Sequence, residues 1–315
     1  MITTIRDLRP GDPTDAESVV RVRRAALPFM ISTARGVAFE LASAHPDKRY
    51  RLLVAENADG LVVGTAQVGI VYDSPEPGQG FVNAYVDPAH RGLGAGTALL
   101  GAAEDHLGAE RAKDAYAWVL DEPPHRAFAE RHGYHASRSA HFLRLDLTTA
   151  ALPALPGKLP AGAELRTASD FAADPRPLFE ADAAASSDEP GDVSQDFDDY
   201  EDWLRHTWNH PYLDPDLTTV VLVDGRVAAF TAAHTDGGTR YSSAMTGTLR
   251  PFRGLGLART AKTDSLLRAR AAGYTEAFTG NDTANAPMLA INTRFGYEVC
   301  ATETRFAKRL PTSDN

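Results

Sequence analysis

The chain has 315 residues, 43% of them hydrophobic and 23% charged, which is typical of a folded protein with room for two ordinary domains. Its formal net charge of −10 argues against a general nucleic-acid-binding protein, because such proteins carry a basic surface. No apolar run approaches the roughly 18 residues of a membrane span, and the N-terminus lacks the apolar core of a signal peptide. The single cysteine, Cys300, excludes an intrachain disulfide, so we expect a cytoplasmic protein without nucleic-acid or membrane partners.

The first half of the chain predicts strands followed by a helix. A strand-like segment begins near Ile5, and residues 51–56 and 61–68 flank an Asn-Ala-Asp-Gly turn, which is typical of a β-hairpin. A further strand ends at Val86, and a glycine-rich loop follows it. The helix expected after this loop presents one apolar face, formed by Leu99, Leu100, Ala103 and Leu107.

The second half repeats this order about 160 residues later, which is the length of a whole domain rather than of a solenoid module. Leu165 opens a strand, residues 219–223 and 227–230 flank the turn Asp224-Gly225, and a further strand ends near Leu249. The helix after the second glycine loop has an apolar face formed by Leu257, Ala258, Ala261 and Leu266. We therefore expect two α+β domains, residues 1–148 and 163–315, joined by a proline-rich linker, residues 149–162.

The two glycine-rich loops carry the clearest chemical signal. Residues 90–96 read His-Arg-Gly-Leu-Gly-Ala-Gly and residues 252–258 read Phe-Arg-Gly-Leu-Gly-Leu-Ala, each between a strand and a helix. Glycine lets the backbone turn tightly, and the helix that follows offers unpaired N–H groups and the positive end of its dipole. Each loop therefore predicts a cradle for a pyrophosphate, although neither completes the dinucleotide-binding or Walker pattern.

Arg-x-x-Gly-x-Gly/Ala directly after a strand resembles the coenzyme A signature of the GNAT superfamily of acetyltransferases. Both loops fit it, and the stretch from Asn281 to Tyr297 is similar to that of a bacterial subgroup. The resemblance covers nearly the whole chain. It implies two tandem GNAT domains, each a mixed, mostly antiparallel sheet flanked by helices with a splayed central strand pair, and acetyl-CoA as co-substrate.

In this superfamily the pantetheine arm lies between the splayed strands, like an added strand. The resemblance assigns the arm to Tyr85 and Val86 in the first copy and to Thr248 and Leu249 in the second. Asn281 and Asn285 would contact the cofactor, although asparagine also suits turns and N-caps. The cradle residues would be Arg91, Gly92, Leu93, Gly94, Ala95, Gly96 and Thr97 in one copy and Arg253, Gly254, Leu255, Gly256, Leu257 and Ala258 in the other.

Acetyl transfer to an amine needs a base, oxyanion donors and a proton for the leaving thiolate. Many GNAT enzymes take that proton from a tyrosine four residues before the glycine of the final Gly-Phe/Tyr pair. Here Ala129 and Asn292 stand at those positions. Asn292, as a hydrogen-bond donor to the sulfur, is the catalytic candidate. We expect catalysis in the second copy, with the first copy as the alternative, because residues 121–132 depart from the second copy's pattern.

An acidic segment suggests what the acceptor is. Residues 182–202 carry nine acidic side chains and no lysine or arginine. In a GNAT domain this region lies beside the acceptor pocket, so a negative wall there would steer a cationic amine. The candidates are Asp196, Asp198, Asp199 and Glu201, and the alternative interpretation is a solvated loop.

We therefore expect an acetyl-CoA-dependent N-acetyltransferase that transfers the acetyl group directly from the thioester to a small amine. One alternative is a non-catalytic acyl-CoA-binding sensor or scaffold, because Ala129 and Asn292 are not acids. Another is a protein lysine or N-terminal acetyltransferase. No histidine pair has a patterned third ligand, so we expect no metal. We expect a monomer or a homodimer.

Overall fold

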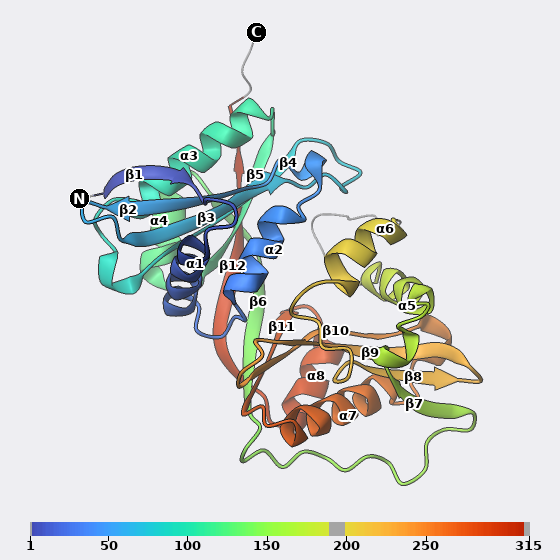
Figure 1. The fold of residues 1–315 in the computed structure, drawn as a ribbon. Helices are drawn as coiled ribbons and strands as arrows, with labels where there is room; N and C mark the ends of the chain where they lie inside the picture. The colour runs from blue at the N-terminus through green and yellow to red at the C-terminus, as the bar shows by residue number, and fades with distance from the viewer. Residues whose placement is uncertain (1, 189–198, 312–315) are drawn as a thin grey trace. The chain divides into compact units, whose positions relative to one another are not determined.

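The computed structural model describes residues 2–188 and 199–311, which fold into two compact units (Figure 1). Of these residues, the first unit contains 2–140 and 301–311, and the second contains 141–188 and 199–300. No helix in the described part of the chain has the length and hydrophobicity needed to cross a membrane.

Helices and strands follow one another as the repeat predicts. The elements of the first half are β1 (Ile2–Asp7), α1 (Pro13–Ala26), α2 (Ala34–Ala42), β2 (Arg51–Asn57), β3 (Val62–Ile70), β4 (Gln79–Val86), α3 (Ala95–Ala109), β5 (Asp114–Leu120), α4 (Pro123–Arg131) and β6 (His135–Asp146). Those of the second half are β7 (Ala163–Thr167), α5 (Arg176–Ser186), α6 (Tyr200–Trp203), β8 (Thr219–Val223), β9 (Arg226–Thr235), β10 (Arg240–Thr248), α7 (Leu257–Ala271), β11 (Glu276–Asp282), α8 (Ala286–Phe295) and β12 (Glu298–Arg309).

Each unit contains a mixed, mostly antiparallel sheet, as predicted. The strand order is β1-β2-β3-β4-β5-β12 in the first unit and β6-β11-β10-β9-β8-β7 in the second. Strands β1 to β4 and β7 to β10 pair antiparallel with their neighbours in sequence. The pairs β4–β5 and β10–β11 are parallel. Both hairpins expected from the sequence are present.

The last strand of each repeat belongs to the core of the other unit. Residues 303–309 of β12 pair antiparallel with β5, and Phe306 is buried in the core that contains α3. Conversely, Leu143 and Leu145 of β6 are buried with Leu266 of α7. The units therefore divide near residues 140 and 300, whereas the sequence places the boundary at 149–162. A repeat offset shows that two sheets exist, but not which sheet edge a given strand completes. Residues 151–162 form neither helix nor strand.

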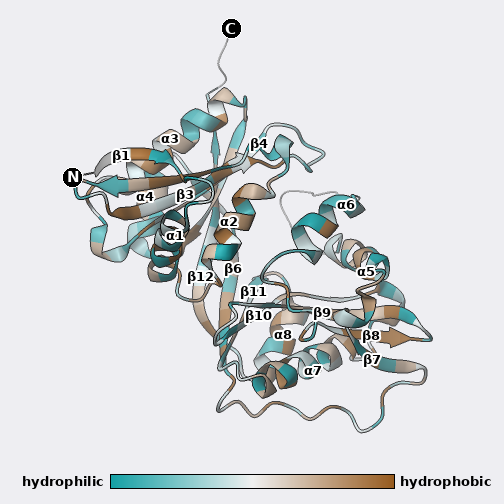
Figure 2. Cartoon of the chain, in the orientation of Figure 1, coloured by the Kyte–Doolittle hydropathy of each residue, from teal (hydrophilic) through white to brown (hydrophobic). Residues whose placement is uncertain are grey.

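Alternate side chains of the strands pack against helices on opposite faces of each sheet. In β2, Leu52 and Val54 are buried with residues of α1 and α2, whereas Leu53 and Ala55 are buried with residues of α3. Strand β8 is buried in the same two-sided way and is hydrophobic along most of its arrow in Figure 2. The α1 and α2 face and the α3 face of the first sheet are thus distinct surfaces.

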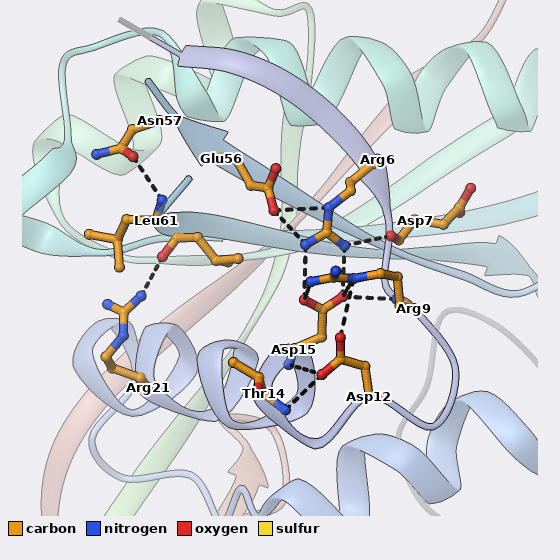
Figure 3. Close-up of polar contacts among 11 residues, drawn as sticks. Arg6, Asp7, Arg9, Asp12, Thr14, Asp15, Arg21, Glu56, Asn57 and Leu61 are labelled. Atoms are coloured by element: carbon orange, nitrogen blue, oxygen red, sulfur yellow. Dashed lines mark hydrogen bonds and ion pairs between the residues drawn. The ribbon is translucent and has the colours of Figure 1, made fainter. Parts of the chain in front are cut away.

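A charged network fixes the start of α1 against β1 and β2 (Figure 3). The side chain of Asp15 is 3% exposed and accepts hydrogen bonds from the guanidinium groups of Arg6 and Arg9 at 2.6–3.1 Å. Arg6 also donates to Glu56 on β2. Asp12 caps the helix by accepting from the backbone N–H groups of Thr14 and Asp15. The network holds α1 across the sheet, so that its C-terminal end reaches the cavity described below.

Replacing Asp15 by asparagine removes the charge that the two guanidinium groups share. We expect the free energy of unfolding at pH 7 to fall by about 2–4 kcal/mol, because a buried ion pair loses one partner. Hydrogen bonds from Arg9 and Arg6 hold the pKa of Asp15 well below its usual range. This stabilisation is therefore present above about pH 4 and is lost as the pH falls toward the folded-state pKa.

Urea unfolding of the wild type and Asp15→Asn at several pH values measures the effect. The difference between the two proteins should shrink on acidification, and a difference that stays constant between pH 7 and pH 2 contradicts a charge-based origin. Glu17→Gln, at an exposed position of the same helix, should leave stability nearly unchanged.

Candidate active site

Strands β4 and β5 of the first unit pair at one end and separate toward the other. Their parallel pairing covers Gln79 to Phe81 opposite Asp114 to Tyr116, and beyond it β4 continues to pair with β3 as far as Val86. The side chain of Asn83 accepts a hydrogen bond of 2.9 Å from the backbone N–H of Trp118, which takes the place of a ladder bond at the opening. This is the splayed strand pair that the sequence predicts.

The second unit opens in the same way. Strands β10 and β11 pair in parallel only over Arg240 to Ser243 opposite Glu276 to Thr279, and β10 continues along β9 to Thr248. Each copy therefore ends its parallel pairing several residues before the strand reaches the glycine loop.

A cavity of about 620 Å³ occupies the gap in the first unit. It is bounded by β4, β5, the glycine loop, α3, α4 and the end of α1. Residues of both sheet faces line it: Ala84 and Val86 belong to the α3 face, whereas Tyr85 belongs to the α1 and α2 face. Among the cradle positions expected from the sequence, those that line the cavity are Arg91, Gly92, Gly94, Ala95, Gly96 and Thr97. Leu93 is not among the lining residues and is 58% exposed.

Both glycine loops have the same backbone conformation. The φ angles are +77° and +92° at Gly92 and Gly94, and +80° and +75° at Gly254 and Gly256, in the region that favours glycine. Gly94 and Gly256 are the N-caps of α3 and α7, and neither helix has a side-chain cap. The first-turn N–H groups therefore remain available to an anion.

The arginines that begin the two loops differ in their partners. Each donates through Nε to a carbonyl of the preceding strand, Arg91 to Val86 and Arg253 to Thr248. In the second copy Asp188 also accepts hydrogen bonds from Arg250 and Arg253, which lower the pKa of Asp188 to about 2. No carboxylate among the described residues pairs with Arg91. The second cradle thus has an internal anion beside its arginines.

The structure brings Asn292 and Asn281 together around a buried lysine. Asn292 is 0% exposed, and its Oδ1 accepts a hydrogen bond of 2.5 Å from Lys262 Nζ. Its Nδ2 donates at 2.5 Å to Oδ1 of Asn281. Burial lowers the pKa of Lys262 to about 7. Both ends of the Asn292 amide are therefore engaged, and a hydrogen bond from it to a thiolate stays a prediction.

Two further groups expected from the sequence have local structural partners. Asn285 caps α8 by accepting from the backbone N–H of Met288 at 3.3 Å. Asp199 caps α6 by accepting from the N–H groups of Glu201 and Asp202, and Glu201 itself is exposed. Asp196 and Asp198 lie outside the described residues. An acceptor-binding role for this segment stays a prediction.

One cavity residue was not singled out from the sequence. Glu303, on β12, lines the cavity of the first unit although it follows the second glycine loop in the chain. It is 6% exposed, and burial raises its pKa to about 7. The sequence does not mark it, because Glu303 lies between Thr302 and Thr304 in a largely polar stretch of the last strand. Among the described residues, no group of three His, Cys, Asp or Glu side chains is arranged to hold a metal ion.

Comparison with known proteins agrees with this geometry. Residues 19–134 match the acetyltransferase (GNAT) family. The chain is 30% identical over 261 residues to a mycothiol acetyltransferase of Clavibacter michiganensis, covering 82% of this chain and 80% of that protein. It is 34% identical over 197 residues to a mycothiol acetyltransferase of Frankia alni, covering 59% of this chain and 56% of that protein.

Two solved structures resemble the chain over nearly its whole length. A tandem GNAT protein from the clavulanic acid biosynthesis pathway has a TM-score of 0.76 at 19% identity, with 99% of both chains covered. A GNAT-type N-acetyltransferase from Sphaerobacter thermophilus has a TM-score of 0.70 at 21% identity, covering 99% of this chain and 97% of that one. The chain therefore belongs to the GNAT family of acetyltransferases and is a tandem member of it. It is an N-acetyltransferase, and its family implies acetyl-CoA as the acyl donor.

Replacing Gly94 by valine should abolish acetyl-CoA binding in the first unit. A β-branched side chain is strained at a φ of +92°, and the loop would have to move away from the phosphate. Calorimetry should show that binding falls by one equivalent relative to the wild type. Gly101→Val is the matched control, because Gly101 is an exposed residue of α3 with open space around it. Unchanged stoichiometry and affinity in Gly94→Val would show that the loop does not hold the cofactor.

Replacing Asp188 by asparagine should strengthen acetyl-CoA binding at the second cradle. The substitution leaves Arg250 and Arg253 without their acidic partner, so both guanidinium groups become available to a phosphate. The gain should diminish at high salt, because exposed charges are screened. Glu201→Gln removes an exposed charge from the same unit and should have no such effect. Equal affinities for Asp188→Asn and Glu201→Gln at low salt would refute a blocking role for Asp188.

Proposed function

We propose that this protein binds acetyl-CoA in the cavity of its first unit and transfers the acetyl group to a small amine. The observation that carries the proposal is the cavity itself, which extends through the β4–β5 gap and is lined from both faces of the sheet. A pyrophosphate on the cradle and a pantetheine arm in the gap would together occupy this cavity. The arm would pair with the edge that β4 leaves open beyond Phe81, as an added strand does.

The binding residues follow from this placement. The N–H groups of Gly92 to Thr97 and the guanidinium of Arg91 would hold the pyrophosphate. Tyr85 and Val86 would contact the arm. In the second copy, Thr248 and Leu249 would contact the arm, and the glycines of the 253–258 loop have matching φ angles, but Asp188 would compete there with a phosphate. We therefore assign the transfer to the first copy, in contrast to the preference drawn from the sequence.

The coenzyme A leaving group does not require a strong acid on the protein. A thiol has a pKa near 8.5, so a coenzyme A thiolate near neutral pH needs little help from a strong acid. The alanine at position 129 is thus compatible with catalysis in the first copy. What the reaction does require is a neutral amine, and hence a group that accepts its proton.

The relatives guide the choice of acceptor. Those named above are mycothiol acetyltransferases, so the acceptor of those enzymes is the first amine to test. A cationic acceptor agrees with the net charge of −10, since an amine approaches a negative protein as an ammonium ion.

The experiment is a panel of amines, incubated with the full chain and acetyl-CoA. It should include the acceptor of the related enzymes, polyamines, amino sugars and a lysine peptide. Free thiol release and the mass of the N-acetyl product are the readouts. We expect turnover of a small amine by the wild type and by Gly256→Val, and none by Gly94→Val. Turnover that survives Gly94→Val and is lost in Gly256→Val would move the reaction to the second copy. Absence of turnover with every amine, together with tight acetyl-CoA binding, would favour a sensor.

A further inference from the structure

The cavity of the first unit contains a buried carboxylate with no partner. Glu303 is 6% exposed, lines the cavity, and receives no hydrogen bond or ion pair from the described residues. An isolated buried carboxylate is costly, and such a group is usually paired unless it has a task. Glu303 lies where β12 completes the first sheet.

The register of β12 places this carboxylate on the face opposite to the cradle. Glu303 lies opposite Leu120 of β5, and Phe306 lies opposite Ala117. Phe306 and Ala117 belong to the α3 core, so Glu303, three residues away in the strand, points to the α1 and α2 face. The guanidinium of Arg305 stacks on the ring of Trp118, which confirms that alternate residues of the two strands share this face.

Other residues show that the cavity reaches this face. Ala26 and Leu27, at the end of α1, line the cavity together with Tyr85 and Glu303. The charge of Glu303 contributes to the raised pKa of Tyr85, after burial as the larger cause. If coenzyme A binds on the cradle at the α3 side, the α1 and α2 side of the gap is left for an acceptor to approach the thioester. Glu303 lies on that approach.

We propose that Glu303, supplied by the last strand of the chain, accepts the proton of the acceptor amine in the first unit. The proposal rests on the function proposed above. The ammonium form of the acceptor gives one proton to the Glu303 carboxylate, directly or through a water. The neutral nitrogen then attacks the thioester carbon, so that a C–N bond forms and the C–S bond breaks. The second proton lost by the nitrogen goes to the coenzyme A sulfur, and Glu303 releases its proton to solvent.

The environment of Glu303 suits a base that works near neutral pH. Burial raises its pKa to about 7, and an efficient general base has a pKa near the working pH. Burial and the charge of Arg91 lower the pKa of His125, another ionisable residue that lines the cavity. The ionisable groups that act on Tyr85, which lines the cavity with Glu303, are Arg23 of α1, Glu40 of α2 and Tyr50 just before β2, and Arg23 pairs with Glu40. The guanidinium groups of Arg305 and Arg138 lie over the ring of Trp118, another residue that lines the cavity.

The test compares wild type, Glu303→Gln and Glu303→Asp, with Glu298→Gln as a control at an exposed position of the same strand. The pH dependence of kcat is measured with an amine that the wild type acetylates, and acetyl-CoA binding is measured by calorimetry. We expect the wild-type kcat to rise with pH through about 7. Glu303→Gln should lower kcat by about 10²- to 10⁴-fold and lose this rise, while it binds acetyl-CoA as the wild type does. Glu303→Asp should keep the increase of kcat with pH, although its kcat should be lower than that of the wild type.

Stability gives a second, independent readout. Because the folded-state pKa of Glu303 is raised, its ionisation destabilises the fold as the pH increases from about 4.5 to about 7. Glu303→Gln should therefore be at least as stable as the wild type above pH 7, which excludes unfolding as the cause of lost activity.

Three outcomes would overturn the proposal. An unchanged kcat with an unchanged pH profile in Glu303→Gln removes the role of base while the proposed function stands. Loss of acetyl-CoA binding in Glu303→Gln shows that the residue supports the cavity instead. A wild type that acetylates no amine overturns both this proposal and the proposed function.

Discussion

The site depends on the incomplete pairing of strands β4 and β5, which leaves a gap in the first sheet. Two parallel strands that stayed paired along their length would fill the middle of the sheet with backbone hydrogen bonds. Here the pairing stops at Phe81, and the Asn83 side chain satisfies the N–H of Trp118 beside the opening. The open edge of β4 then points to the glycine cradle. The open backbone edge of β4 and the glycine loop line one cavity because the same strand leads into both, so an extended ligand with phosphates could occupy them together.

The two repeats exchange their last strands, so each repeat depends on the other for its core. Strand β12 closes the edge of the first sheet, and Phe306 fills the core beneath α3. The C-terminal part of β6 serves the second core in the same way. Neither repeat has a complete core without a strand from the other half of the chain. The acidic side chain that faces the first cavity therefore comes from the second repeat.

The predictions from sequence succeed where the chemistry is local. Glycine at 92, 94, 254 and 256 is required by positive φ angles. The apolar faces predicted for both following helices are buried, except that Ala258 is half-buried, because loop and helix are each encoded by a short stretch. Both hairpins follow from their turns and alternating strands for the same reason.

The features that the sequence does not reveal depend on contacts between distant segments. The Asp188 contact with Arg253 joins residues 65 positions apart, and the place of Glu303 depends on which sheet β12 completes. Lys262 is similar: its position on α7 is visible in the sequence, whereas its burial against Asn292 is not. Contacts between residues that are far apart in the sequence leave no local sequence pattern, so periodicity and motif spacing cannot predict them.

The most direct test of the account is a crystal structure of the full chain with coenzyme A and an N-acetylated product. The account predicts a pyrophosphate on residues 91–97, a pantetheine arm between β4 and β5, and the product amide on the α1 and α2 side within hydrogen-bonding reach of Glu303. Coenzyme A bound solely at residues 253–258, or a product held away from Glu303, would contradict it.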